Sequence, residues 1–155
     1  MTTIGIELDG TAKETTAREL QATLAELVDL SLQGKQAHWH VTGGRFLPLH
    51  EQLDTLVDDA GGWSDDVAER LVTLGVPADG RAATVAATTP LEEFPQGFVD
   101  QDKVVALVVD RLGLVASDVR RRAELLGGPD LASQDLLIEI LRGVEKHLWM
   151  FQAQR

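Results

Sequence analysis

The chain has 155 residues, of which 25 are acidic and 14 are basic, so its formal net charge at pH 7 is −11. One domain is the usual outcome at this length, and an acidic surface attracts cations and repels phosphate backbones, although surplus acid also serves solubility alone. The absence of cysteine excludes disulfides, zinc fingers and iron–sulfur clusters, and it is typical of a protein in a reducing cytoplasm.

The N-terminal residues, MTTIGIELDG, contain no basic segment followed by an apolar run. No stretch of the chain approaches the roughly 18 consecutive apolar residues of a transmembrane helix. We therefore expect neither a signal peptide nor a membrane span, and we expect a cytoplasmic protein. Gly5 and Gly10 bracket a short run in this segment, which indicates a tail over residues 1–12 and a single domain over residues 13–155.

An amphipathic helix is predicted from about residue 13 to His40, because leucines and His38 recur there at three-, four- and seven-residue steps. Glycines at 43–44 end this helix. Pro48 suits the first turn of a second helix, which extends to about residue 74. The short connection predicts that the two helices form an antiparallel hairpin.

Residues 76–101 are rich in proline, glycine, alanine and threonine and show no sustained periodicity. A third helix is predicted over residues 102–126, and a fourth follows a cap at Asp130 or Ser133 and continues almost to the end of the chain. The sequence therefore predicts an all-α four-helix bundle in which residues 76–101 form a long crossover between parallel second and third helices.

Two histidines and three carboxylates stand out between residues 38 and 69. His50 and Asp54 are one helical turn apart, and so are Asp65 and Glu69, on a stripe that also contains apolar residues. Nitrogen ligands mixed with carboxylate oxygens suit iron, manganese or zinc better than calcium or magnesium. Singly, each residue has an ordinary structural interpretation, such as a hydrogen-bonded core histidine for His38, but together they favour a transition-metal site.

Asp54 and Asp65 cannot reach one metal ion along a single straight helix. Eleven residues separate them, which corresponds to roughly 16 Å at the α-helical rise. Either the helix breaks at the glycines 61–62 and folds back, or a second copy of the chain completes the site. We favour a twofold dimer, in which His38, His50 and Asp54 of one subunit meet Asp65 and Glu69 of its mate.

This segment resembles the ferroxidase-centre region of the Dps family, the mini-ferritins known as DNA-binding proteins from starved cells. The family pattern is matched at Lys35, His38, Trp39, Gly44, Phe46, Leu49, His50, Leu53, Asp54, Asp65, Ala68, Glu69 and Arg70. The similarity covers most of the chain. One departure is His40, where the family commonly has asparagine; we expect it to face solvent or make a local hydrogen bond rather than to add a weak ligand.

The resemblance implies a ferritin-like four-helix bundle with a short extra helix in the crossover, near residues 91–94. It also implies that Fe(II) is oxidised, preferably by hydrogen peroxide, at di-iron or mono-iron centres between subunits, and that ferric mineral is stored in a hollow dodecamer built from twofold dimers. The implied iron ligands and catalytic residues are His38, His50, Asp54, Asp65 and Glu69.

Two further roles follow from the same resemblance. Trp39 lies beside the first ligand and is a candidate electron donor when only one iron is bound, with a core aromatic as the alternative interpretation. Acidic residues near the start of the fourth helix line threefold pores in the family, and Asp130, Asp135 and Glu139 occupy that position here. For Asp130 and Asp135, complementing the helix dipole is an equally good interpretation.

Binding to DNA is expected to be weak or absent. Family members that bind DNA often use lysine-rich tails, whereas residues 1–19 carry four acidic residues against Lys13 and Arg18. The basic run at residues 120–122 is interpreted as complementing a helix dipole and forming salt bridges. Two alternatives stay open at this stage, namely a metal-dependent hydrolase that uses the same site and a DNA-compacting protein in which iron is secondary.

Overall fold

A computed structural model describes residues 5–155 and confirms the all-α bundle with a long crossover. Five helices and two very short strands follow one another along the chain: α1 (Gly10–His40), β1 (Val41–Thr42), α2 (Phe46–Thr73), α3 (Ala82–Thr88), β2 (Val99–Asp100), α4 (Gln101–Leu126) and α5 (Leu131–Gln152). Among the helices of this part of the chain, none combines the length and apolar character that a membrane span requires.

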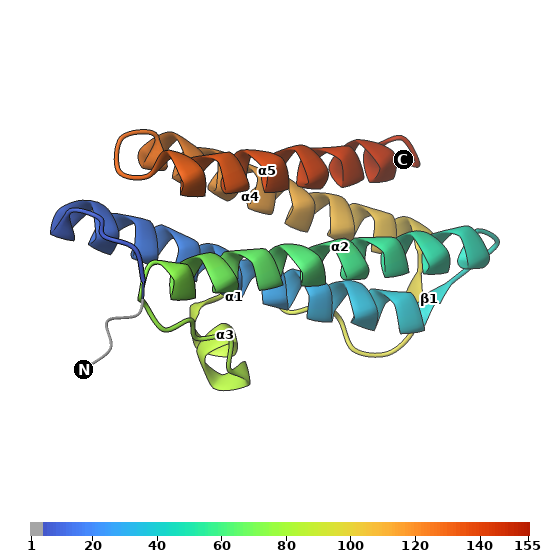
Figure 1. Cartoon of the computed structure of the whole chain (residues 1–155). Helices are drawn as coiled ribbons and strands as arrows, with labels where there is room; N and C mark the ends of the chain where they lie inside the picture. The colour runs from blue at the N-terminus through green and yellow to red at the C-terminus, as the bar shows by residue number, and fades with distance from the viewer. Residues whose placement is uncertain (1–4) are drawn as a thin grey trace.

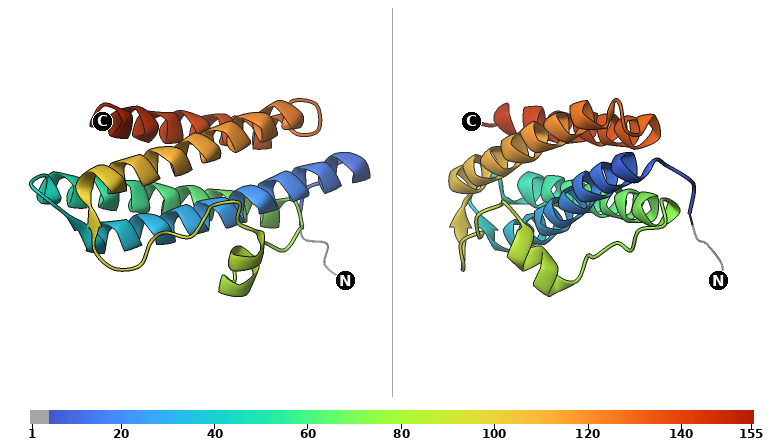
Figure 2. Two further views of the ribbon diagram at one scale, coloured as in Figure 1. Left: turned by 180° about the vertical axis from the view of Figure 1, so that it is seen from behind. Right: turned by 90° about the vertical axis from the view of Figure 1, so that its left-hand side faces the viewer.

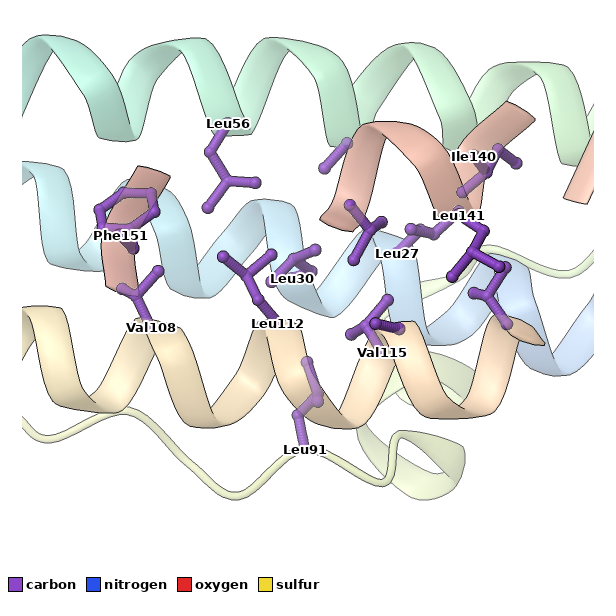
Figure 3. Close-up of a cluster of buried hydrophobic side chains, with 14 of the residues drawn as sticks. Leu27, Leu30, Leu56, Leu91, Val108, Leu112, Val115, Ile140, Leu141 and Phe151 are labelled. Atoms are coloured by element: carbon purple, nitrogen blue, oxygen red, sulfur yellow. The ribbon is translucent and has the colours of Figure 1, made fainter. Parts of the chain in front are cut away.

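The four long helices form two hairpins that pack against each other. The pair α1 and α2 lies beside the pair α4 and α5, and the crossover with α3 runs along the outside of the bundle (Figures 1 and 2). The buried core fills the space between the hairpins. Figure 3 shows that all four long helices contribute to it, with Leu27, Leu56, Leu112 and Phe151 among the fully buried side chains.

Helix α1 begins at Gly10, three residues before the expected start at residue 13. The reason is a cap that the periodicity did not reveal: the Asp9 carboxylate accepts a hydrogen bond from the backbone amide of Ala12 at 3.4 Å. The expected tail is therefore shorter by those three residues. Its residues 1–4 lie outside the part of the chain that the structure describes.

Helix α2 is continuous from Phe46 to Thr73 and passes through Gly61 and Gly62 without a break. Both glycines are exposed, and a side chain at either position would meet no atom within 4 Å. This excludes the fold-back that we considered for bringing Asp54 and Asp65 together. The carboxylates of Asp54 and Asp65 are therefore held apart on one continuous helix.

The crossover contains its short helix at Ala82–Thr88, so the expectation of a helix near residues 91–94 was wrong. Leu91 instead anchors an extended segment in the core, where only 6% of its surface is exposed. The guanidinium of Arg111, on α4, donates to the carbonyls of Glu92 and Glu93 and lies 5.5 Å from the ring centre of Phe94. The side chain of Arg111 therefore supplies the hydrogen bonds that these two carbonyls need, so this segment does not require helical hydrogen bonds.

The two strands form a short parallel ladder, in which Val41 pairs with Val99 and Thr42 with Asp100. Two residues are too few to show a strand period, so the sequence pattern does not predict this ladder. It fixes the end of the crossover against the loop between α1 and α2. The histidine-bearing end of this hairpin is thereby tied to the start of α4.

Buried charge also joins the two hairpins. Arg122, on α4, forms an ion pair with Glu26, on α1, and both side chains are almost fully buried. The neighbouring Arg120 and Arg121 pair with Glu145 and with Glu19, respectively. The expected salt-bridge role of the arginine run is confirmed. One oxygen of Glu26, Oε1, has no hydrogen-bond partner within residues 5–155.

We expect this carboxyl to make stability depend on pH. Burial raises the pKa of Glu26 from 4.5 to about 7, although Arg122 acts in the opposite direction. Between these two values the folded state binds more protons than the unfolded state. Stability should therefore fall as pH rises through this window, by up to about 3 kcal/mol, and level off above it.

Urea unfolding at about pH 5 and pH 8 checks this prediction, because Glu26→Gln should lack this component of the pH dependence. The difference in stability between wild type and Glu26→Gln is the quantity to compare. A difference that stays constant across the window would contradict the raised pKa.

Candidate metal centre

Two imidazoles stack where α1 ends and α2 begins. The ring centres of His38 and His50 are 3.6 Å apart, with an angle of 18° between the ring planes. His38 is buried and His50 is half-buried. The short loop between the two antiparallel helices brings them together, since each lies within the turns nearest to it.

Each of the two histidines determines which ring nitrogen of the other carries a hydrogen. His38 Nδ1 lies 2.7 Å from the backbone carbonyl of His50, and His50 Nδ1 lies 2.8 Å from the backbone carbonyl of His38. A carbonyl oxygen only accepts, so both Nδ1 atoms carry the hydrogen. In the neutral rings both Nε2 atoms then keep a lone pair, the form in which histidine binds a metal ion.

Asp54 completes this group one turn after His50. Its Oδ1 lies 3.5 Å from His38 Nδ1 and 2.5 Å from the ammonium nitrogen of Lys35. The hydrogen bond from Lys35 holds the pKa of the Asp54 carboxyl below its ordinary value, and the nearby imidazoles act in the same direction. Asp54 is therefore an ionised ligand candidate that an ammonium group already neutralises.

Asp65 and Glu69 lie on the same helix but outside this group. Both side chains are exposed, and neither takes part in an ion pair within residues 5–155. The inward-facing stripe that we expected to contain them is formed instead by apolar residues of α2, and Asp54 is itself about half exposed. Over the described part of the chain, no three histidine, aspartate or glutamate side chains converge closely enough to hold a metal ion.

Comparisons with known proteins agree with this architecture. Residues 17–155 match the ferritin family, described as a ferritin-like domain. The chain is 33% identical over 150 residues to the DNA protection during starvation protein of Agrobacterium fabrum, covering 95% of this chain and 91% of that protein.

The chain belongs to the Dps family of ferritin-like proteins.

Other relatives extend the comparison. DNA protection during starvation protein 2 of Deinococcus radiodurans is 37% identical over 134 residues, which cover 86% of this chain but only 56% of that protein, so the chain spans about half of its length. The solved structure of Dps from Microbacterium arborescens in the high iron form has a TM-score of 0.91 and 34% identity, with 97% of each chain covered.

Other predicted residues of this Dps-family chain have clear positions. Trp39 is 59% exposed, so it is not a core aromatic within the single chain. His40 Nδ1 lies 2.9 Å from the carbonyl of Gln36, which is the local hydrogen bond expected for it. Asp135 and Glu139 are exposed on α5.

Asp130, the other pore candidate, forms hydrogen bonds within the helix bundle of this Dps-family chain. Its carboxylate accepts hydrogen bonds from Arg70, at 2.7 Å, and from Ser133, at 2.5 Å. Burial alone would raise the pKa of Asp130, but these two hydrogen bonds outweigh it and the pKa is lowered. The pore assignment of Asp130 is thus not supported within the chain, because only 9% of its surface is exposed.

Sequence reasoning missed the fourth histidine of this Dps-family chain. His147, on α5, is 2% exposed, and its Nε2 lies 2.6 Å from Oδ2 of Asp59, on α2. The residues are 88 positions apart in sequence. The only local signal was a histidine among the apolar residues of the last helix, which does not identify a partner.

Proposed function

We propose that this Dps-family protein oxidises Fe(II), preferably with hydrogen peroxide, at centres shared between two subunits, and stores the ferric product as mineral inside a hollow dodecamer. The observation that carries the proposal is the pair of stacked imidazoles, whose Nδ1 atoms are both engaged by backbone carbonyls so that Nε2 stays available, with the ionised Asp54 carboxylate close by. Iron is the substrate and cargo. Family membership and the relative whose structure is described as a high iron form support this choice of metal.

A second copy is required because one copy holds only half of the ligands. Asp65 and Glu69 lie on the unbroken α2, roughly 16 Å or more along the helix axis from Asp54. A twofold axis that crosses α2 between these two groups would place each group opposite the other in the partner, which creates two equivalent sites. The exposure of both carboxylates fits this arrangement, since they need no contact within their own chain.

The charges of the residues suit ferrous ion. Neutral His38 and His50 supply nitrogen ligands, and the three carboxylates supply negative charge that stabilises Fe(III) more than Fe(II). When peroxide takes one electron from each of two ferrous ions and two protons from solvent, two ferric ions and two water molecules result. This two-electron reduction avoids the release of hydroxyl radical.

Anaerobic loading with Fe(II), followed by peroxide, tests the proposal. Rapid Fe(III) formation, with the mineral retained by the assembled protein during size-exclusion chromatography, is expected. A chain that stays monomeric and yet oxidises Fe(II) at full speed would contradict the shared centre. We place the protein in the cytoplasm in this proposal, where its absence of cysteine is typical.

Binding to DNA is proposed to be weak or absent, although relatives are named for DNA protection. The arginine run on α4 is already paired with acidic side chains of the same chain. Phosphate neutralisation needs several free cations on one surface, and the net charge of −11 opposes it. Salt-sensitive gel retardation by the assembled protein would contradict this part of the proposal.

Lys35→Met should strengthen metal binding. The ammonium of Lys35 occupies the Asp54 carboxylate that the metal needs, so its removal should raise the anaerobic affinity for Co(II), used as a probe, by about tenfold. Lys13→Met is a matched control, because Lys13 lies in the first turns of α1, at the opposite end of that helix from Lys35. Unchanged or weaker Co(II) binding in Lys35→Met alone would count against Lys35 as a competing cation.

Trp39→Phe should lower the yield of protein radicals when one Fe(II) per centre reacts with peroxide. Trp39 follows the ligand His38 and is exposed in the subunit, so its replacement by another aromatic residue should not disturb the fold of the subunit. Electron paramagnetic resonance of rapidly frozen samples measures the radical, and size-exclusion chromatography measures the assembly. A radical yield equal to that of wild type would remove the redox role of Trp39.

A further inference from the structure

Trp63 occupies the seam between α2 and α5, in direct contact with the α5 backbone. A Cβ atom at Gly143 would lie only 2.3 Å from the Trp63 ring, so the glycine is what allows the indole to lie there. The Trp63 ring also meets His147 edge-on, with ring centres 6.1 Å apart and planes at 75°. The indole is half-buried.

A carboxylate is positioned on the same side of α2. Asp59 lies one helical turn before Trp63, and His147 lies one turn after Gly143, so the two pairs face each other across the seam. His147 Nε2 lies 2.6 Å from the Asp59 carboxylate, while its buried Nδ1 has no partner within residues 5–155. A carboxylate oxygen only accepts, so His147 Nε2 carries a hydrogen and donates it to Asp59.

This arrangement places a carboxylate one helical turn from the indole. Within residues 5–155, Asp59 forms no salt bridge with a lysine or an arginine, and its salt-bridge partner is His147. The buried imidazole orients the carboxylate, of which about half is exposed. An anion held near an aromatic ring stabilises positive charge that develops on that ring.

Composition directs attention to tryptophan as the electron source. The chain contains neither cysteine nor tyrosine, so its three tryptophans are the side chains that lose one electron most readily. Within the subunit itself Trp63 is shielded by α5, whereas Trp39 and Trp149 are 59% and 65% exposed and would be shielded only where another subunit covers them. Shielding protects an oxidised indole from reaction with water and with other molecules.

We infer that Trp63 is an electron donor for peroxide reduction when one ferrous ion is bound, with Asp59 and His147 as positioning residues that stabilise the oxidised indole. This inference rests on the proposed function. Trp63 precedes the proposed ligand Asp65 by two residues and lies on the opposite side of α2, about one helix diameter or roughly 10 Å across. Trp63 thus lies near the proposed centre in the subunit that supplies Asp65 and Glu69. Trp39 lies near it in the subunit that supplies His38 and His50.

The step balances without another reductant. Hydrogen peroxide takes one electron from Fe(II) and one from the Trp63 indole, and it takes two protons from solvent. Its O–O bond breaks, and the products are Fe(III), an indole radical cation and two water molecules. The indole keeps its N–H hydrogen, and Asp59 balances the new positive charge.

The test uses the full-length assembled protein with one Fe(II) per centre and one equivalent of peroxide, mixed anaerobically and frozen at successive times. Electron paramagnetic resonance and visible absorption report the radical, and iron absorption reports Fe(III). Trp63→Phe should remove the part of the radical signal that comes from Trp63, about half if Trp39 and Trp63 supply equal shares of the second electron, without lowering the yield of Fe(III). Trp39→Phe combined with Trp63→Phe should remove most of the signal.

Asp59→Asn separates charge from packing, because it keeps the indole and a hydrogen-bonding group in place. It should shorten the radical lifetime severalfold and shift the absorption toward that of the neutral indole radical, and Trp149→Phe should change neither. A yield and lifetime in Trp63→Phe equal to those of wild type would overturn the inference, as would a wild-type protein that forms no tryptophan radical. Failure of the shared iron centre is recognised separately, because Fe(III) formation would then not depend on Asp65 and Glu69.

Discussion

Replacing Asp65 and Glu69 together by alanine should slow Fe(II) oxidation by peroxide at least about 100-fold, since loss of even an indirect contact to a metal ligand costs about 10- to 100-fold. Both side chains are exposed and neither forms an ion pair within residues 5–155, so the fold of each subunit should remain intact. Stopped-flow absorption after anaerobic Fe(II) loading measures the rate. Asp58→Ala with Asp66→Ala is the matched control, because it removes the same charge from exposed positions of the same helix.

Mixed assemblies give the sharper form of this test. One subunit carries His38→Ala and His50→Ala, and the other carries Asp65→Ala and Glu69→Ala, so neither forms an active centre alone. If the centre spans two subunits, each mixed dimer contains one complete centre, and random pairing should restore about a quarter of the wild-type centres. No recovery of activity in mixed assemblies of normal size would overturn the shared centre.

At pH 8, where the Glu26 carboxyl is mainly ionised, Arg122→Met should lower the free energy of unfolding by about 3–5 kcal/mol, the usual cost of leaving a buried charge without its partner. Arg122 and Glu26 are 5% and 0% exposed, and Arg122 also contacts Thr23 at 3.4 Å, so no water replaces the lost guanidinium easily. Urea unfolding followed by circular dichroism measures the loss.

The adjacent Arg120 supplies the control for this prediction. It pairs with Glu145 at an exposed position, so Arg120→Met should cost at most about 1 kcal/mol. Arg122→Met combined with Glu26→Gln should recover part of the stability, because the second change removes the stranded carboxyl. Equal losses in Arg122→Met and Arg120→Met would show that burial of the ion pair does not matter.

Local periodicity was sufficient to predict the four long helices. Their apolar residues recur with the helical period, and glycine and proline mark most of the ends, so these elements could be placed within a few residues. The error at the start of α1 came from Asp9, whose capping role depends on one side-chain hydrogen bond. The spacing of His50, Asp54, Asp65 and Glu69 also followed from helix geometry alone, and so did the conclusion that one straight helix cannot join them.

Contacts between distant parts of the chain decided the rest. The burial of Leu91 and the hydrogen bonds from Arg111 hold residues 91–94 in an extended conformation. The sequence of that segment does not indicate this conformation. Which helix lies opposite decides whether a polar side chain is buried, exposed or paired. This applies to the buried Asp130, to the outward-facing Asp65 and to the pair of His147 with Asp59. The sequence of one helix does not show which helix packs against it. The helices and the types of ligand follow from local spacing, so both could be predicted from the order of residues along the chain. Packing between the hairpins determines which carboxylates are buried in ion pairs and which, within residues 5–155, form none.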